Sequence, residues 1–340
     1  MKQHLLSKGL LLDNNGNLNE AGYAFDLVKT YERKAIKASR FRIKEWDYYY
    51  IGDENFGIAL TVADNSYMAL MSVSVLDFKN KTESTKSYMK WFTFGKLSLP
   101  SSSADGDIEV KNKKYHMHFI NEHGKRRLVC YMKNVSKGKD FSCDISLTPT
   151  NNNSMVIAIP FNKKHHFYYN QKINNLFGVG SFTFGSFTYS FSSSYGVLDW
   201  GRGVWTYSNT WYWSSLNSEY QGHKIGFNLG YGFGDTSNAS ENMLFIDKEA
   251  YKLDDVTFDI PKDKGGKDDF LKPWNITSAN HDIDLVFTPL INRKAKMNAL
   301  ILESDQNQIF GLFTGTFTIK GETIRIDNLL GFAEKVKNRW

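Results

Sequence analysis

The 340-residue chain has few residues that form disulfide crosslinks or interrupt helices and strands, with only two cysteines and six prolines. Two thiols, Cys130 and Cys143, cannot build the disulfide framework of a small secreted domain, although they could face each other across a hairpin. The first residues contain no apolar core long enough for a signal peptide. We therefore expect a reduced, cytoplasmic protein.

Long apolar runs and blocks of one charge are also missing. No stretch approaches the ~20 apolar residues that cross a bilayer, so we expect no stable membrane insertion. The formal charge is only +6, and the 42 basic side chains are scattered among 36 acidic ones. That pattern does not favour nucleic-acid binding, which needs a basic patch or tail. No feature of the sequence specifies an oligomeric state.

Aromatic residues are abundant, at 15% of the chain, and they occur in segments that alternate apolar and smaller or polar positions. Alternation with a period of two is typical of strands with one buried face. It is found at 56–62, 71–75, 88–94, 108–119, 127–132, 141–147 and 155–159, and again in seven segments between 225 and 330. The sequence therefore predicts an all-β protein.

One short helix is expected near the N-terminus. Asn19 could cap it, and apolar residues at helical spacing continue to about Ser39. A chain of this length exceeds the usual single core, which favours two domains. We expect consecutive antiparallel strands to close into tandem lipocalin-like (calycin) barrels, one over residues 1–190 with the leading helix and one over 191–340.

The aromatic residues between Gly178 and Phe191 change phase at Gly185-Ser186. A bulge at this point would keep five aromatic side chains on one side of the sheet. Aromatics on both sides, between two packed layers, are an equally open alternative.

Residues 195–215 contain four of the eight tryptophans. In an extended chain one side of this segment carries Asp199, Gly201, Gly203, Trp205 and Tyr207. The side chain of Asp199 would thus lie beside bare backbone and flat rings. Aromatic walls bury apolar ligands and stabilise developing cations, and a carboxyl group buried among them has a raised pKa.

Two interpretations of this segment remain open. In the functional one, Asp199 donates a proton, Arg202 orients Asp199 or a substrate anion, and rings shelter the cation; the expected ligand contacts are Trp205, Tyr207, Trp211 and Trp213. In the structural one, Asp199 and Arg202 form an internal ion pair and the tryptophans pack a domain interface.

Other candidate sites are weaker. Alternating Gly230, Gly232 and Gly234 are not followed by a helix, which argues against a phosphate-binding loop. Asn228 nearby could orient a polar end of the ligand. His116 and His118 share one side of a strand but have no third ligand identifiable in the sequence, so no metal is expected. Glu334 is expected to pair near the end of the chain rather than to bind ligand. No cofactor is indicated.

Long motifs resemble a bacterial family, domain-of-unknown-function family 2804. They are Pro160-Phe161 with 166–170, then 198–205, then 226–235, and finally Gly331-Phe332-Ala333-Glu334 with Arg339-Trp340. The resemblance extends over nearly the whole chain and implies no particular activity. Tyr169, within the first motif, is a further expected ligand contact.

A more distant likeness is to carotenoid 1,2-hydratase-like proteins, which are tandem lipocalin-type barrels. Residues 196–200 and the strand around Trp211 to Trp213 are similar to their Gly-Trp-Leu-Asp-His-Glu-Trp segment and tryptophan-rich strand. This resemblance implies that Asp199 is the proton donor to an alkene. Val197 replaces the first tryptophan of that segment, and Trp200-Gly201 replaces the His-Glu pair.

These observations predict a protein whose joined barrels enclose an apolar small-molecule site. The expected function is a cofactor-free hydratase, isomerase or cyclase acting on an isoprenoid-like substrate. The alternative is a non-catalytic carrier of a lipid or similar hydrophobe in the same cavity.

Overall fold

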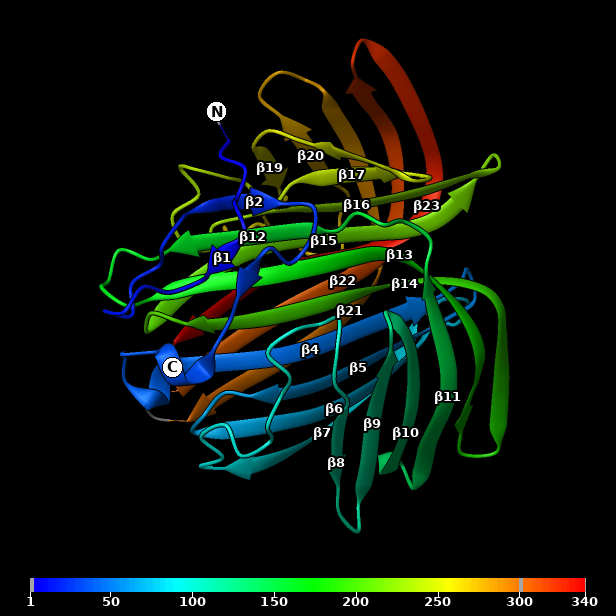
Figure 1. The fold of residues 1–340 in the computed structure, drawn as a ribbon. Helices are drawn as coiled ribbons and strands as arrows, with labels where there is room; N and C mark the ends of the chain where they lie inside the picture. The colour runs from blue at the N-terminus through cyan, green and yellow to red at the C-terminus, as the bar shows by residue number, and fades with distance from the viewer. Residues whose placement is uncertain (1–2, 300–301, 340) are drawn as a thin grey trace.

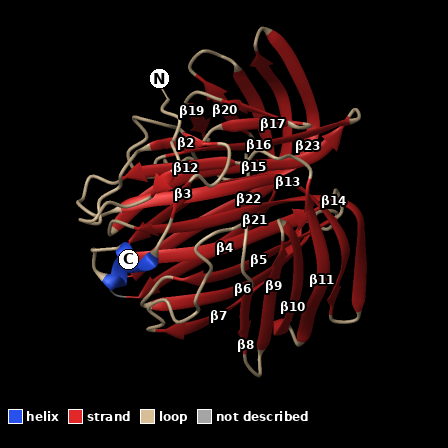
Figure 2. Ribbon diagram, viewed as in Figure 1, coloured by secondary structure: helices blue, strands red, loops and turns tan. Residues whose placement is uncertain are grey.

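A computed structural model describes residues 3–299 and 302–339, and it is built almost entirely of antiparallel strands (Figures 1 and 2). The described helices are two short 3₁₀ turns, Arg33–Ala35 and Arg40–Arg42. No helix among the described residues has the length and apolar character needed to span a membrane. The all-β prediction is confirmed.

The predicted N-terminal helix is wrong. Its residues form β2 (Gly22–Ala24) and β3 (Lys29–Thr30) instead. β2 pairs with the edge of β12, and β3 makes a short parallel pair with β1 (Gly9–Leu10). In this segment, hydrogen bonds to neighbouring strands are favoured over a helix, because tertiary contacts easily override a weak helix propensity.

The first sheet has twelve strands and ends at residue 204. Its main path runs β7-β6-β5-β4-β14-β13-β11-β10-β9-β8, while β12 pairs with β13 and β2. Besides β2, its strands are β4 (Ile43–Gly52), β5 (Phe56–Asp64), β6 (Met68–Asp77), β7 (Thr82–Trp91), β8 (Ile108–Lys111), β9 (Tyr115–Glu122), β10 (Lys125–Ser136), β11 (Lys139–Pro149), β12 (Met155–Pro160), β13 (Phe167–Phe184) and β14 (Phe187–Val204).

The second sheet has nine strands in the order β18-β17-β16-β15-β23-β22-β21-β20-β19. They are β15 (Ser208–Tyr220), β16 (His223–Tyr231), β17 (Met243–Ile246), β18 (Glu249–Lys252), β19 (Val256–Asp259), β20 (Trp274–Ser278), β21 (Ile283–Ala299), β22 (Leu302–Ile319) and β23 (Glu322–Arg339). The hydrogen-bonded sheets therefore divide between Val204 and Ser208. A domain boundary at residue 191, inside β14, remains a prediction.

Both sheets curl strongly, so that distant strands approach each other. In the first sheet Tyr88 of β7 lies 5.5 Å from the ring of Tyr115 on β9 and donates a hydrogen bond to the carbonyl of Lys133. In the second, the backbone N–H of Phe258 on β19 donates to the hydroxyl of Tyr231 on β16. The two curled sheets give the expected tandem-barrel architecture.

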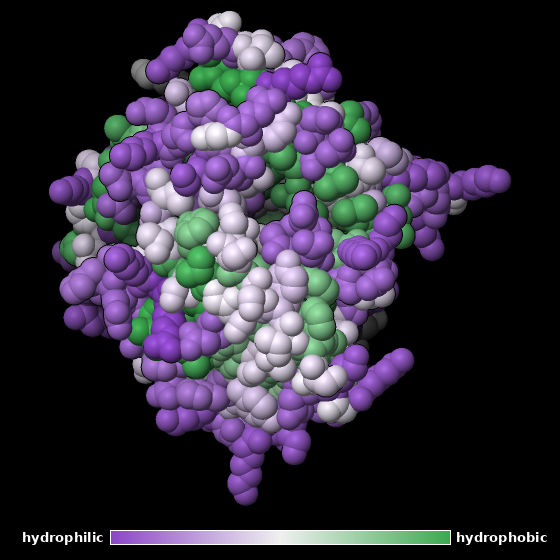
Figure 3. Space-filling model, turned by 90° about the vertical axis from the view of Figure 1, so that its right-hand side faces the viewer, coloured by the Kyte–Doolittle hydropathy of each residue, from purple (hydrophilic) through white to green (hydrophobic). Residues whose placement is uncertain are grey.

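Apolar side chains fill the interior of each curled sheet. One buried cluster, which includes Leu60, Met117 and Trp200, occupies the first, and another, which includes Phe227, Trp274 and Phe313, occupies the second. Two smaller clusters join the sheets, one around Tyr50 and Phe310 and the other around Ile157, Trp205 and Phe233. Hydrophilic side chains dominate the periphery of the surface in Figure 3.

The aromatic phase change near Gly185 has a different cause from the predicted bulge. Gly185 and Ser186 form the tight turn that joins β13 to β14, and Gly185 has a positive φ of 64°. Phe184 pairs with Phe187 and Phe182 with Tyr189, so the rings still share one side. Cys130 and Cys143 are likewise direct cross-strand partners, as expected for a hairpin, and both are free thiols.

Gly201 on β14 provides the space in which the Trp46 ring of β4 lies. A Cβ atom at this position would lie 1.9 Å from the ring. Trp46 stacks on Tyr168 with ring centroids 6.2 Å apart and meets Trp205 edge-on at 5.2 Å. A missing side chain therefore allows this aromatic cluster to pack directly against the backbone.

We predict that Gly201→Ala lowers the free energy of unfolding by about 1–3 kcal/mol, because overpacking forces a rigid ring to move. Gly265→Ala is the matched control: its Cβ would have only Asp263 Oδ1 nearby, at 3.3 Å in an exposed loop. Urea denaturation measures both variants. Equal midpoints for Gly201→Ala and the natural protein would contradict this account.

Candidate functional site

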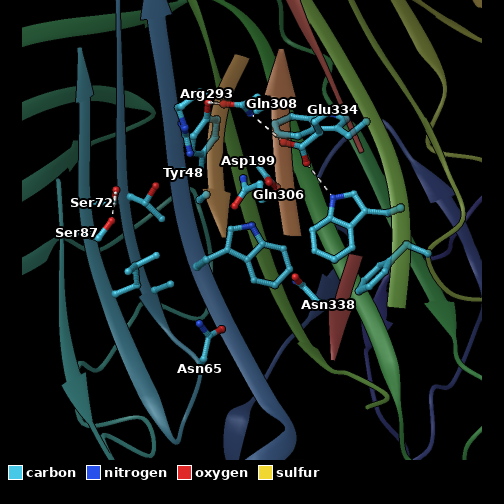
Figure 4. A pocket seen from close by; sticks show the side chains of 18 of the residues that line it. Tyr48, Asn65, Ser72, Ser87, Asp199, Arg293, Gln306, Gln308, Glu334 and Asn338 are labelled. Carbon is cyan, nitrogen blue, oxygen red and sulfur yellow. Dashed lines mark hydrogen bonds between the residues drawn. The ribbon is translucent and has the colours of Figure 1, made fainter. Parts of the chain in front are cut away.

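A cavity of about 220 Å³ lies between the two sheets, not inside either barrel. The first sheet contributes side chains from β4, β5, β6, β7, β13 and β14, and the second from β15, β21, β22 and β23 (Figure 4). Exposed Lys294 and Ala295 lie on its border, so the cavity opens to solvent on this side. Buried apolar side chains pack inside each curled sheet, and this cavity belongs to the seam between the sheets.

One wall of the cavity is a row of side chains that crosses the first sheet at right angles to its strands. Directly paired residues of antiparallel strands project to the same side of a sheet. The register therefore aligns Lys172, Asp199, Tyr48, Thr61, Ser72 and Ser87, one from each of six neighbouring strands. All six line the cavity.

The second sheet supplies the opposite wall in the same way. Its register aligns Arg293, Gln308, Glu334 and Trp213 on four neighbouring strands, and all four line the cavity. Tyr48 of the first row donates a hydrogen bond of 3.2 Å to Gln308 Oε1. The two rows thus meet across the seam, with Arg293, Tyr48 and Gln308 together at one end in Figure 4.

Asp199 is held as an ion pair. Its Oδ1 atom lies 2.8 Å from Lys172 Nζ and accepts a hydrogen bond of 2.7 Å from Asn170 Nδ2. The ammonium also lies 3.9 Å from the centre of the Trp213 ring, a cation–π contact. Both side chains are almost fully buried, so the pair places two opposite, mutually compensating charges in the wall of the cavity.

Glu334 is the carboxyl group with the environment of a proton donor. It is only 3% exposed, and burial raises its pKa from 4.5 to about 7. Hydrogen bonds from Trp211 Nε1 at 2.9 Å and Gln308 Nε2 at 3.0 Å, with the charges of Arg293 and Lys172, limit this rise. A carboxyl group with such a pKa exchanges a proton near neutral pH.

Glu241 is a third carboxyl group of the cavity. It comes from the segment between β16 and β17, over Gly230, whose missing Cβ leaves room for the carboxylate. Burial raises the pKa of Glu241, and the nearby charge of Lys172 opposes that rise. The sequence suggested one acid in the cavity, whereas three carboxyl groups line it.

An aromatic wall faces these charges. Trp205 lies edge-on to Trp46 and Trp211, and Phe233 packs against Trp205 at 4.7 Å between ring centroids. Three of the expected ligand contacts, Trp205, Trp211 and Trp213, line the cavity together with Asp199. The rings therefore pack the seam and line the cavity at once.

Asn228, another predicted contact, lies behind Trp213. It accepts a hydrogen bond of 2.6 Å from Trp213 Nε1 and donates one to the carbonyl of Glu241. It does not line the cavity, and its observed role is to fix the Trp213 ring.

Arg202 lies on the opposite side of β14 from Asp199, because residues three apart on a strand face opposite ways. Its guanidinium group donates to Asp47 Oδ1 at 3.1 Å and to the carbonyl of Pro100 at 2.7 Å. The proposed Asp199–Arg202 ion pair is therefore not formed, and Arg202 does not contact the cavity.

Tyr169 and Tyr207 are also away from the cavity. Tyr169 points into the core of the first sheet, where its hydroxyl donates to the carbonyl of Lys29, and its neighbour Tyr168 lines the cavity instead. Tyr207 follows the end of β14 and is 38% exposed. A shift of one residue in a strand exchanges the two sides of the sheet, which accounts for Tyr169.

Sequence reasoning missed Lys172, Arg293 and Gln308 and assigned Glu334 to pairing near the chain end. Arg339, considered with Glu334, instead lies 3.5 Å from Glu303. The available signal was a charged residue directly after an apolar run, as with Glu334 after the run 329–333. Such residues are rarely buried without a partner or a function.

A separate cluster on the surface joins His116 and His118 of β9 to Glu109 of β8. Their ligand atoms lie within 4.8 Å of one another, so the structure supplies the third residue that the sequence did not identify. Glu109 Oε1 also lies 2.9 Å from Lys111 Nζ. A cation already neutralises this oxygen, and we describe the group as a surface ion-pair cluster.

The raised pKa of Glu334 predicts a pH-dependent stability. The folded state favours the protonated form of Glu334. The contribution of this group to the free energy of unfolding is therefore fully present below pH 4.5 and is lost as the pH rises through about 7. Relative to Glu334→Gln, the natural protein should lose about 3 kcal/mol of unfolding free energy over this range. Urea denaturation across pH measures the difference. Glu322→Gln, at an exposed position of the same strand, is the control. An equal pH profile for Glu334→Gln and the natural protein would refute the raised pKa.

Comparison with solved structures shows which proteins share this architecture. An AttH-like protein from Nitrosomonas europaea superposes with a TM-score of 0.56 at 12% identity, covering 93% of this chain and 98% of that one. Kievitone hydratase from Nectria haematococca superposes with a TM-score of 0.55 at 13% identity, covering 97% and 98%. At such identities these likenesses establish the fold alone, and no curated protein sequence matches.

The family comparison covers residues 2–340. It includes both sheets and every side chain of the cavity. The match agrees with the motifs noted in the sequence between Pro160 and Trp340. The chain therefore belongs to the family described as Domain of unknown function (DUF2804).

Proposed function

We propose that the protein is a cofactor-free enzyme that protonates an apolar, unsaturated small molecule in the cavity between the sheets. The observation that carries this proposal is Glu334, a buried carboxyl group with a pKa raised to about 7, which lines the same cavity as four tryptophan side chains. General acids work best when their pKa lies near the operating pH. A hydratase or isomerase reaction needs such a group.

In the hydration reaction, the Glu334 proton is transferred to one carbon of a double bond, whose electron pair forms the new C–H bond. The remaining carbocation lies among the rings of Trp46, Trp205 and Trp211, whose faces attract positive charge. Water then forms the new C–O bond, and its surplus proton returns to Glu334 directly or through solvent. The net change is the addition of one water molecule.

Asp199 receives a different role from the one suggested by the sequence. Lys172 and Asn170 both donate to its carboxylate and hold it in place. In our proposal this carboxylate orients the attacking water, while Glu334 donates the proton. The shared fold of a hydratase supports the reaction class, and the residues named here support the mechanism.

A carrier of a hydrophobic molecule is the second candidate. The aromatic wall and the opening beside Lys294 favour binding in either case. A carrier, however, needs no acid with a pKa near neutrality. Turnover therefore separates the two functions.

We predict that the natural protein incorporates heavy oxygen from labelled water into isoprenoid alkenes or allylic alcohols, measured by mass spectrometry. Glu334→Gln should abolish labelling but keep binding, measured by tryptophan fluorescence. The value of kcat/KM should fall about tenfold per pH unit above the pKa of Glu334, because only the protonated form reacts.

Exposed Glu322→Gln is the control for loss of one carboxyl group from the same strand, and it should leave labelling unchanged. Binding without labelling by the natural protein would support the carrier and contradict the enzyme. Labelling that persists in Glu334→Gln would remove Glu334 as the proton donor.

A further inference from the structure

Arg293 on β21 has a buried guanidinium group that lacks a hydrogen-bonding partner at one nitrogen. The residue is 8% exposed and lines the cavity. Its Nη1 atom is buried and makes no hydrogen bond. The guanidinium carbon lies 5.8 Å from the centre of the Tyr48 ring, which supports the group without satisfying its N–H donors.

An unsatisfied buried cation is costly, so it calls for an explanation. Arg202, the other buried arginine near the seam, shows the usual solution: an aspartate and three backbone carbonyls accept its hydrogen bonds. No carboxylate lies within ion-pair distance of Arg293 among the described residues. Arg293 lines a cavity that a ligand can enter.

The charges of the cavity give the sign of the missing partner. Two buried cations, Lys172 and Arg293, line the cavity, and Asp199 pairs with Lys172. Exposed Lys294 lies on the border, where solvent screens its charge. Burial raises the pKa of both Glu241 and Glu334, which favours the neutral form of each acid. Arg293 is therefore the buried cation of the lining that an anionic group of a ligand would complement.

We propose that Arg293 binds the carboxylate of the ligand, so that the substrates of this cavity are apolar, unsaturated carboxylic acids. This inference rests on the proposed function, because it names the substrate class of the same site. The planar guanidinium group matches a carboxylate, with two parallel N–H···O contacts.

The row across the second sheet positions such a ligand. Arg293 and Glu334 are separated by one strand, which places their Cα atoms roughly 10 Å apart. Both side chains line the cavity, with Gln308 on the strand between them. A carboxylate on Arg293 therefore directs the adjoining double bond toward the Glu334 proton, while the hydrocarbon part lies along Trp46 and Trp211.

Isothermal titration calorimetry with cinnamate and cinnamyl alcohol tests this proposal. The two probes share ring and double bond and differ in the carboxylate. The natural protein should bind cinnamate at least about tenfold more tightly than cinnamyl alcohol, because only the carboxylate forms charge-assisted hydrogen bonds with the guanidinium group. Arg293→Gln should remove the preference and leave affinity for the alcohol within about twofold. Arg293→Lys should keep part of it, since the charge remains but the planar fork is lost.

Lys296→Gln is the matched control, a cation on the same strand that is exposed and does not line the cavity. It should leave the preference intact. Equal affinities of the natural protein for the two probes, or binding of neither, would overturn the inference without recourse to any variant. A preference that survives in a folded Arg293→Gln protein would do the same.

The outcomes separate this inference from the proposed function. If Glu334-dependent labelling persists without any preference for cinnamate, the substrate class is wrong and the reaction stands. If the Arg293-dependent preference holds and no compound is labelled, the cavity binds carboxylic acids as a carrier, and the enzyme proposal fails.

Discussion

The buried ion pair between Lys172 and Asp199 constrains the whole seam between the two sheets. Removing two charges from water costs several kcal/mol per ion, and a seam built for cohesion alone is more stable when apolar. The pair persists because Asn170 donates to the carboxylate and the Trp213 ring lies over the ammonium. Trp213 belongs to the second sheet, so the Lys172 ammonium keeps its cation–π contact only when the second sheet is docked correctly.

Much of the fold could be predicted because strand alternation is a local property. The period of two located most strands. The pairing of β4 with β14 and of β15 with β23 could not be predicted, because it joins residues more than a hundred positions apart. The N-terminal segment failed for a related reason: its partner β12 is remote in sequence, and a helical spacing was the only local signal.

The site was predictable only where its residues are dense along the chain. Asp199 and three tryptophans fall within fifteen residues of one another and were found. The opposite wall takes one residue from each of four strands, so Arg293, Gln308 and Glu334 have no common spacing. Strand parity alone explains why Arg202 was misplaced, since a residue three positions from Asp199 faces the other side of the sheet. Strand register, rather than composition, determines which side chains line the cavity.

The two roles expected for the tryptophans of residues 195–215, packing an interface and lining a cavity, are compatible in this structure. Trp205 and Trp213 pack the interface, and the same rings line the cavity, because a seam between two convex walls leaves a gap where the walls diverge. Neither sheet holds a complete site. The first carries the Lys172–Asp199 pair, and the second carries Glu334 and the uncompensated charge of Arg293. A mutation that only weakens docking would therefore impair chemistry before it unfolds either barrel, since each barrel has its own core and the site lies between them.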